Sequence, residues 1–179
     1  MNSVRTMHRI ALLLFLVPVA LVAHESGFPS ETLKKVFPEA SGFTARKKTL
    51  TPEQLKKAEQ DSGSKVQRND NPLTYYVAVK GQDALGTVLM LDTRGIKGGI
   101  NLAVGIRRDG SVSRVVVVEN KDDAKLSAAA FLDQIQGKTL QSPLKVGQDI
   151  KYSGDAQSAQ AVLSAVKRGL SLLAAAQSK

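Results

Sequence analysis

The stretch G-I-K-G-G-I-N-L-A-V-G-I-R-R-D-G-S-V-S-R-V-V-V-V-E-N, residues 95–120, contains two runs that are rich in apolar and β-branched residues. The runs cover residues 101–106 and 111–119, and Asp109-Gly110 lies in the short segment between them. An Asp-Gly pair between two such runs is typical of a tight β-hairpin. This stretch therefore predicts two neighbouring antiparallel strands.

A second pair of strand-like runs, residues 74–79 and 86–91, precedes this hairpin. Segments with helical periodicity flank the two pairs, and they cover residues 31–37, 52–61 and 128–135. Consecutive hairpins between helices are typical of the α+β class. We therefore expect a twisted antiparallel sheet of about four to six strands, with helices packed on one side.

The helix expected at 52–61 has clear boundary signals. Thr51 can cap its first turn, Pro52 suits the first helical position, and Gln54 stands where a capping box has its glutamine. Gly63 follows its end. The polar residues 62–73 predict a loop that leads into the first strand.

Residues 1–23 have the composition of an export signal, because Arg5 and Arg9 precede an uninterrupted apolar run that ends in a small residue. The run is shorter than the roughly 20 residues of a standard membrane span. Cleavage is expected, and a short membrane anchor is the alternative. The predicted location is periplasmic or exported. A helical N-terminal region, 24–73, and a folded domain, 74–179, are expected to follow.

Composition excludes several kinds of site. The sequence contains no cysteine, which excludes disulfides, thiolate-bound iron–sulfur clusters and c-type haem attachment. With His8 and His24 as its two histidines, no metal site is expected. The net charge of +9 is spread along the chain without interleaved aromatics, which favours a solvated surface, and the predicted export argues against a nucleic-acid partner. An anionic envelope surface remains a possible partner.

Near the C-terminus, D-I-K-Y-S-G-D-A-Q-S-A-Q-A-V, residues 149–162, runs from a Ser-Gly turn into an amphipathic helix. Asp155 stands at the expected N-cap. The amides at a helix start form a natural seat for a phosphate group. An ordinary capped helix is the alternative interpretation of the same residues.

Taken together, these motifs resemble the FMN-binding domain family, which includes the flavin subunits of the sodium-pumping NADH:quinone reductase and of the Rnf complex. The resemblance rests on residues 95–120, on F-L-D-Q-I-Q-G-K at 131–138, and on the pairs at 153–154 and 161–162. The family pattern at the helix start is D-x-x-S-G-A-T-x-[ST]-S-x-A-V. The resemblance implies an FMN site there, with the phosphate joined to the threonine.

The sequence departs from this pattern at several positions. Ala156 replaces the acceptor threonine, and Asp155 replaces the preceding alanine. Asp149 stands one residue too early, so Ile150 occupies the place of the family's aspartate. Residues 120–125 lack the glycine and hydroxyl of the family's flavin-bordering loop, and their charges can form a solvated turn. The resemblance therefore implies FMN held without a covalent bond, or a degenerate site.

The expected flavin cleft lies between the glycine-rich loop and the helix start, where Lys97 or Lys151 could neutralise a phosphate. An aspartate at the helix start would compete with that phosphate for the same amides. No nucleophile–base pair is evident, so no catalytic residues are assigned. The predicted cofactor-binding residues are Gly98, Gly99, Ser153, Gly154, Asp155, Ala156, Gln157 and Ser158.

Three functions are compatible with these features, and the first of them is the expected one. The first is an exported redox module that carries FMN and passes electrons between membrane or periplasmic redox proteins. The second is a flavin-free scaffold that keeps the fold beside a flavinylated or membrane redox partner. The third is a basic protein that docks to anionic lipid or envelope polymer. An electron carrier or accessory protein is expected rather than a stand-alone enzyme.

Overall fold

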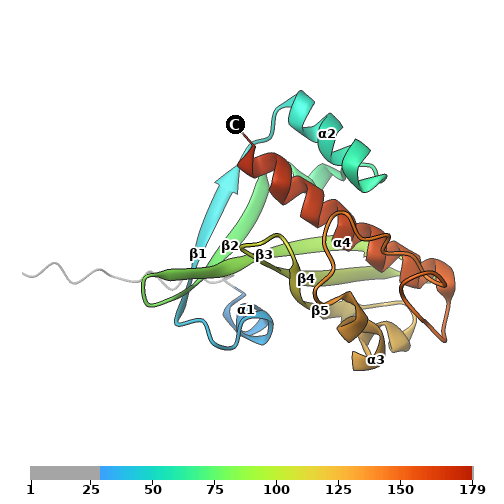
Figure 1. Ribbon diagram of the computed structural model, residues 1–179. Coiled ribbons are helices and arrows are strands. Elements are labelled where there is room, and N and C mark those ends of the chain that lie inside the picture. Colours follow the sequence, from blue (N-terminus) through green and yellow to red (C-terminus); the bar gives the residue numbers. More distant parts are fainter. Residues whose placement is uncertain (1–28, 179) are drawn as a thin grey trace, which may run out of the picture.

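The computed structural model describes residues 29–178, so the predicted export signal lies outside the described residues. Helices and strands alternate at first, and four consecutive strands then precede a long C-terminal helix (Figure 1). The elements are α1 Ser30–Val36, β1 Gly42–Lys48, α2 Pro52–Ser62, η1 Arg68–Asp70, β2 Leu73–Lys80, β3 Asp83–Arg94, β4 Gly99–Arg107, β5 Val112–Asn120, η2 Ala124–Ser127, α3 Ala129–Leu132, η3 Asp133–Ile135 and α4 Ala156–Gln177.

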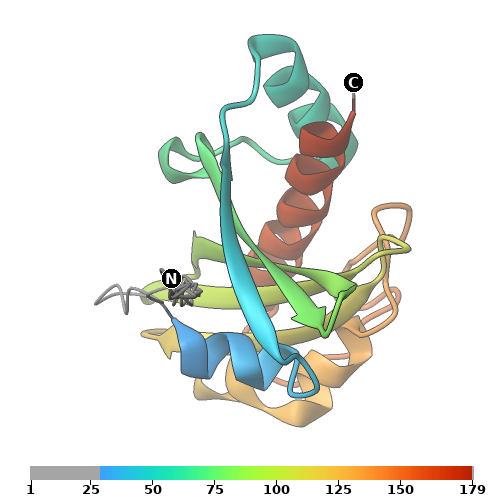
Figure 2. The same cartoon turned by 90° about the vertical axis from the view of Figure 1, so that its left-hand side faces the viewer.

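The five strands form one antiparallel sheet in the order β1-β2-β3-β4-β5, so each strand pairs with the next along the chain. The predicted α+β class and antiparallel sheet are confirmed. Strand β1 was not expected, because its segment belongs to the region 24–73 that was predicted to be helical. Phe43 pairs with Ala78 of β2, which makes β1 an edge strand of the same sheet. Figure 2 shows β1 running from the α1 end of the molecule to α2.

The main core lies between the sheet and the long helix α4, with α2 packed beside α4 (Figure 1). Apolar residues recur along one side of α4, among them Val162, Leu163 and Val166, and all three are fully buried. They belong to one cluster with Leu89 and Leu102 of the sheet. Because apolar burial provides most of the stability of a small domain, this contact holds the fold together.

Helix α1 packs on the opposite face of the sheet, whereas the expectation had placed the helices on one side. Leu33, Val36 and Phe37 form a second, smaller cluster with sheet residues such as Ala78 and Val88. The short α1 therefore covers part of the face that α4 leaves open, as Figure 1 shows.

A buried ion pair links α4 to the segment before β2. Nε of Arg168 lies 2.9 Å from Oδ2 of Asp70, and the two side chains are 4% and 3% exposed. The Arg168 guanidinium also donates to the backbone carbonyl of Asp92 on β3, at 2.7 Å. One arginine thus ties the helix, the sheet and the loop before β2 together.

The local signals for α2 are confirmed. The Thr51 hydroxyl accepts from the Gln54 amide, the Gln54 side chain accepts from the Thr51 amide, and Gly63 ends the helix in the left-handed region with φ of 67°. The helix expected at 128–135 is instead divided into α3 and η3. Within residues 29–178, no helix has both the length and the hydrophobicity needed to cross a bilayer.

Candidate functional site

The start of α4 has the cap that the sequence predicted. Asp155 is the N-cap residue, and its Oδ1 accepts a hydrogen bond of 2.7 Å from the Ser158 amide. Ala156 and Gln157, the first two helical residues, have exposed side chains. Ser158 is fully buried, and its hydroxyl contacts the glycine-rich loop between β3 and β4.

The glycine-rich loop lies directly against this helix start, in the region where the flavin cleft was expected. The Ile96 amide donates to Oγ of Ser158 at 3.1 Å. A Cβ atom at Gly95 would lie 2.7 Å from that oxygen and 2.7 Å from Oδ2 of Asp122, so only glycine fits there. Gly98 is buried, whereas Gly99 begins β4 and pairs with Arg94. The structure therefore brings Gly98 and Ser158 to the same carboxylate, which lies between the loop and the helix start.

That carboxylate belongs to Asp122, which was expected to form part of a solvated turn. Its Oδ2 accepts from the amides of Lys97 at 2.5 Å and Gly98 at 2.9 Å, and its Oδ1 accepts from the Asp123 amide at 2.9 Å. Burial raises the pKa of Asp122, but hydrogen bonds from the Ser158 hydroxyl and these amides outweigh it and lower the pKa to about 2. Asp122 is therefore an anion that the loop amides hold in place.

Asp123 occupies the other side of the helix start. Its Oδ2 accepts from the Tyr152 hydroxyl at 2.7 Å and from the Asp155 amide at 3.0 Å. A Cβ atom at Gly154 would lie 2.0 Å from the same oxygen, so the glycine is required to admit the carboxylate. Donation from the Lys125 amide and the Tyr152 hydroxyl lowers the pKa of Asp123. The backbone amide of Asp155, which was expected to face a phosphate, therefore donates to Asp123 instead.

The remaining predicted residues lie close to this pair of carboxylates. Ser153 is exposed, and its carbonyl accepts from Nζ of Lys125 at 3.2 Å. Three carboxylates, those of Asp122, Asp123 and Asp155, lie at the positive end of α4 or on the loop beside it. A phosphate brought to these amides would displace or repel them. The residues present therefore do not fit an FMN phosphate at this position.

The signal that could have identified the two aspartates was their position in the sequence. They stand between β5 and the segment that leads into α3. Charge by itself favours a solvated turn there, because most charged residues lie on the surface. Their role depends on backbone amides from two distant segments, and these amides cannot be placed from sequence spacing.

Asp122→Asn is expected to reduce stability by roughly 1–2 kcal/mol at pH 7, because the amides of Lys97 and Gly98 lose a charged acceptor. The folded-state pKa of Asp122 lies below the ordinary value of 3.8. Its contribution is therefore present above about pH 4 and is lost as pH falls toward 2. Urea unfolding at pH 7 and at pH 3 measures this, with the exposed Asp83→Asn as the control. A difference from wild type that does not shrink at pH 3 would contradict the assignment.

Comparison with known proteins supports the fold. No protein-family profile and no curated protein matches the chain. Among solved structures, the fold is similar to that of NqrC from Shewanella oneidensis, with a TM-score of 0.50 and 14% sequence identity. The match covers 77% of this chain and 82% of the NqrC chain. At this identity the similarity establishes a shared fold.

Proposed function

We propose that the protein is an accessory domain of an exported or membrane-associated electron-transfer system, and that it carries no covalently attached flavin. Two findings support a role in that type of system. The fold is similar to that of NqrC, and the sequence resembles the FMN-binding domain family, which includes the flavin subunit of the sodium-pumping NADH:quinone reductase. One observation carries the flavin-free part of the proposal. Amides in the glycine-rich loop and at the start of α4, those of Gly98, Asp155 and Ser158, bind the chain's own carboxylates of Asp122, Asp123 and Asp155.

The role that follows is recognition of a redox partner rather than storage of electrons. The amides of Gly98, Asp155 and Ser158 already have carboxylate acceptors from the chain itself, so these contacts form without a cofactor. The expected partner is a membrane or periplasmic redox protein, in agreement with the export signal predicted at residues 1–23. Within the described residues, the face of the sheet beside α1 retains two exposed apolar side chains, Met90 and Val118, that a partner could cover.

The first test is the visible spectrum of the mature protein purified from a host that expresses a flavin transferase. Wild type is expected to be colourless, because Ala156 offers no hydroxyl and the carboxylates repel a phosphate. Colour that stays with the protein after acid precipitation would contradict the proposal. A double variant restores the family pattern with Asp155→Ala and Ala156→Thr, and it tests whether the hydroxyl is sufficient.

The double variant is expected to remain largely unlabelled until Asp123 is also changed to serine. Asp123 still accepts from the backbone amide of residue 155 in the double variant, so the seat stays occupied. The matched control adds Asp133→Ser, an exposed aspartate on η3, in place of the Asp123 change. Equal labelling of the double variant and the triple variant would show that Asp123 does not close the seat.

A non-covalent FMN carrier is the second candidate function. It is favoured by the contact between the glycine-rich loop and the helix start, which the Ile96–Ser158 hydrogen bond establishes. In this case the exposed residues Lys97, Ala156 and Gln157 would border the flavin, and bound FMN would supply one- or two-electron transfer. Wild-type protein that is yellow, and that releases its colour to the supernatant on acid precipitation, would favour this function over the first.

A further inference from the structure

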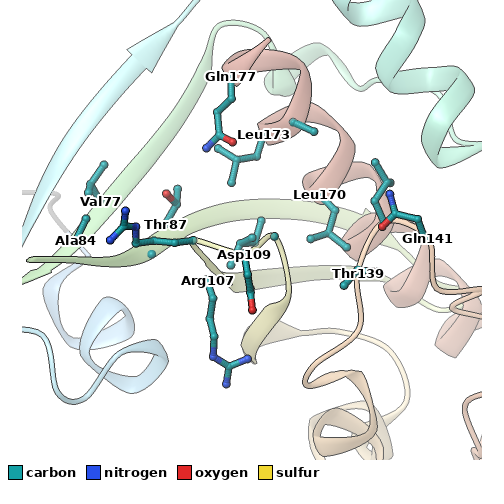
Figure 3. A pocket seen from close by; sticks show the side chains of 16 residues that line it. Val77, Ala84, Thr87, Arg107, Asp109, Thr139, Gln141, Leu170, Leu173 and Gln177 are labelled. Carbon is teal, nitrogen blue, oxygen red and sulfur yellow. The ribbon is translucent and has the colours of Figure 1, made fainter.

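A cavity of about 460 Å³ lies at the other end of the molecule from the start of α4. Its walls come from four parts of the fold: the β2–β3 hairpin, the turn between β4 and β5, the loop at 139–141, and the C-terminal half of α4. Figure 3 shows Val77, Thr87, Leu170 and Leu173 around this space. Its volume lies within the range of about 300–1,000 Å³ that is usual for small-molecule sites.

The floor of the cavity is apolar and is set by the fold itself. Ile106, Leu170 and Leu173 line it, and they are 2%, 4% and 5% exposed. The strand register shifts next to the cavity, between Ala78 and Val79 in one pair and between Gly105 and Ile106 in another. Such bulges bend a strand and change the direction of its side chains, and they recur beside binding sites.

The rim carries one guanidinium that makes no interaction within the described part of the chain. Arg107 is engaged, because it donates to the Ser111 hydroxyl and to the Val112 carbonyl, and Figure 3 shows it pointing away from the cavity. The Asp109 carboxylate accepts from the Ser111 amide and hydroxyl. Arg108, between them, is exposed and lines the cavity without a hydrogen bond or ion pair in residues 29–178.

Neutral polar groups complete the rim. They are the hydroxyls of Thr87 and Thr139 and the amides of Gln141 and Gln177. The negative end of the α4 dipole also lies near the cavity, but the last carbonyls of the helix have partners. The ammonium of Lys48 donates to Ala176, and the Gln54 amide donates to Ala175. The unpaired positive charge is therefore at the turn, and the helix end is largely neutralised.

We propose that this cavity binds a small organic anion with a flat or elongated apolar body. The anionic group pairs with the Arg108 guanidinium, and the body lies on Leu170 and Leu173. The planar guanidinium matches a carboxylate through two parallel hydrogen bonds. The hydroxyl and amide groups on the rim can donate further hydrogen bonds to the same carboxylate oxygens. The proposal is independent of the function proposed above, because the cavity shares no residue with the start of α4.

The probe is 2-naphthoate, and the uncharged 2-naphthamide is its matched control. Titration of the folded, ¹⁵N-labelled protein is expected to shift backbone signals at Thr87, Arg108, Gln141 and Leu173. Arg108→Gln is expected to weaken naphthoate binding about tenfold or more, because a charge-assisted pair is lost, and to leave naphthamide binding nearly unchanged. Arg46→Gln, which removes an exposed arginine on β1 outside the cavity, should leave both unchanged.

A second variant tests the location without removing charge. Ala174 is an exposed helical residue at the cavity, so Ala174→Phe adds volume there at little expected cost to folding. It should abolish the shifts of both probes, and the far-ultraviolet circular dichroism should match wild type. The proposal is overturned if naphthoate causes no shifts at millimolar concentration, if it binds no better than naphthamide, or if the shifts map to residues 95–98 and 153–158.

Discussion

Arg168→Leu is expected to lower the free energy of unfolding by about 3–5 kcal/mol, because it leaves the buried carboxylate of Asp70 without its counterion. The arginine and the carboxylate are 2.9 Å apart and almost fully buried. The substitution also leaves the carbonyl of Asp92 without its donor. Urea unfolding followed by circular dichroism at pH 7 measures the change.

The control and the double variant separate the ion pair from general damage. Lys57→Ala removes an exposed pair within α2, between Lys57 and Asp61, and should cost less than about 1 kcal/mol. Asp70→Leu combined with Arg168→Leu removes both charges, so it is expected to be more stable than Arg168→Leu. A single variant that loses under about 1 kcal/mol, or a double variant no better than the single one, would refute the assigned role.

Phe37→Ala is expected to cost about 3–5 kcal/mol, the usual range for truncating a buried phenylalanine. Phe37 is 2% exposed and closes the second core under α1. Two glycines of the sheet leave space for the C-terminal end of α1. A Cβ atom at Gly86 would lie 2.7 Å from the Phe37 ring, and one at Gly105 would lie 2.4 Å from the Val36 side chain. The substitution should therefore release α1 from the sheet.

Thermal and urea unfolding give the stability of the Phe37→Ala variant, and limited proteolysis reports on α1 directly. Cleavage between residues 30 and 41 is expected to become faster. The matched control is Val118→Ala, which truncates a side chain of β5 that is 45% exposed and should change stability by less than about 0.5 kcal/mol. If both variants lost similar stability, the cluster under α1 would not contribute separately to the stability of the domain.

Local signals in the sequence predicted most of the sheet and the helix ends. The Asp-Gly turn at 109–110 joins β4 and β5, and the Thr51 capping box begins α2 where expected. Strand β1 was missed because its edge position leaves four consecutive residues, Thr44–Lys47, exposed, so the alternation of a half-buried strand is absent. The side of the sheet that α1 covers depends on Gly86 and Gly105, because a side chain at either position would meet Phe37. That these two glycines lie under Phe37 can be known only once the pairing of all the strands is known.

The sequence predicted the contact between the glycine-rich loop and the start of α4, and the cofactor-binding role of these residues stays a prediction. The helix start and the glycine-rich loop are joined through Ser158, as the motif spacing implied. The resemblance also implied that Ala156 stands at the position of the acceptor threonine. The position of Asp122 and Asp123 against the same amides was not evident, because hydrogen bonds between distant segments follow from tertiary packing rather than from local propensity. FMN binding itself remains a prediction.

The place of α4 in the chain has a consequence for how the protein is made. All five strands are synthesised before residues 156–177, yet the main apolar surface of the sheet is covered by that helix. A nascent chain therefore cannot complete its core until the helix has emerged from the ribosome, because the helix supplies one side of that core. The predicted export signal requires a chain that stays loosely folded while it crosses the translocation channel, and this order of assembly provides such an interval.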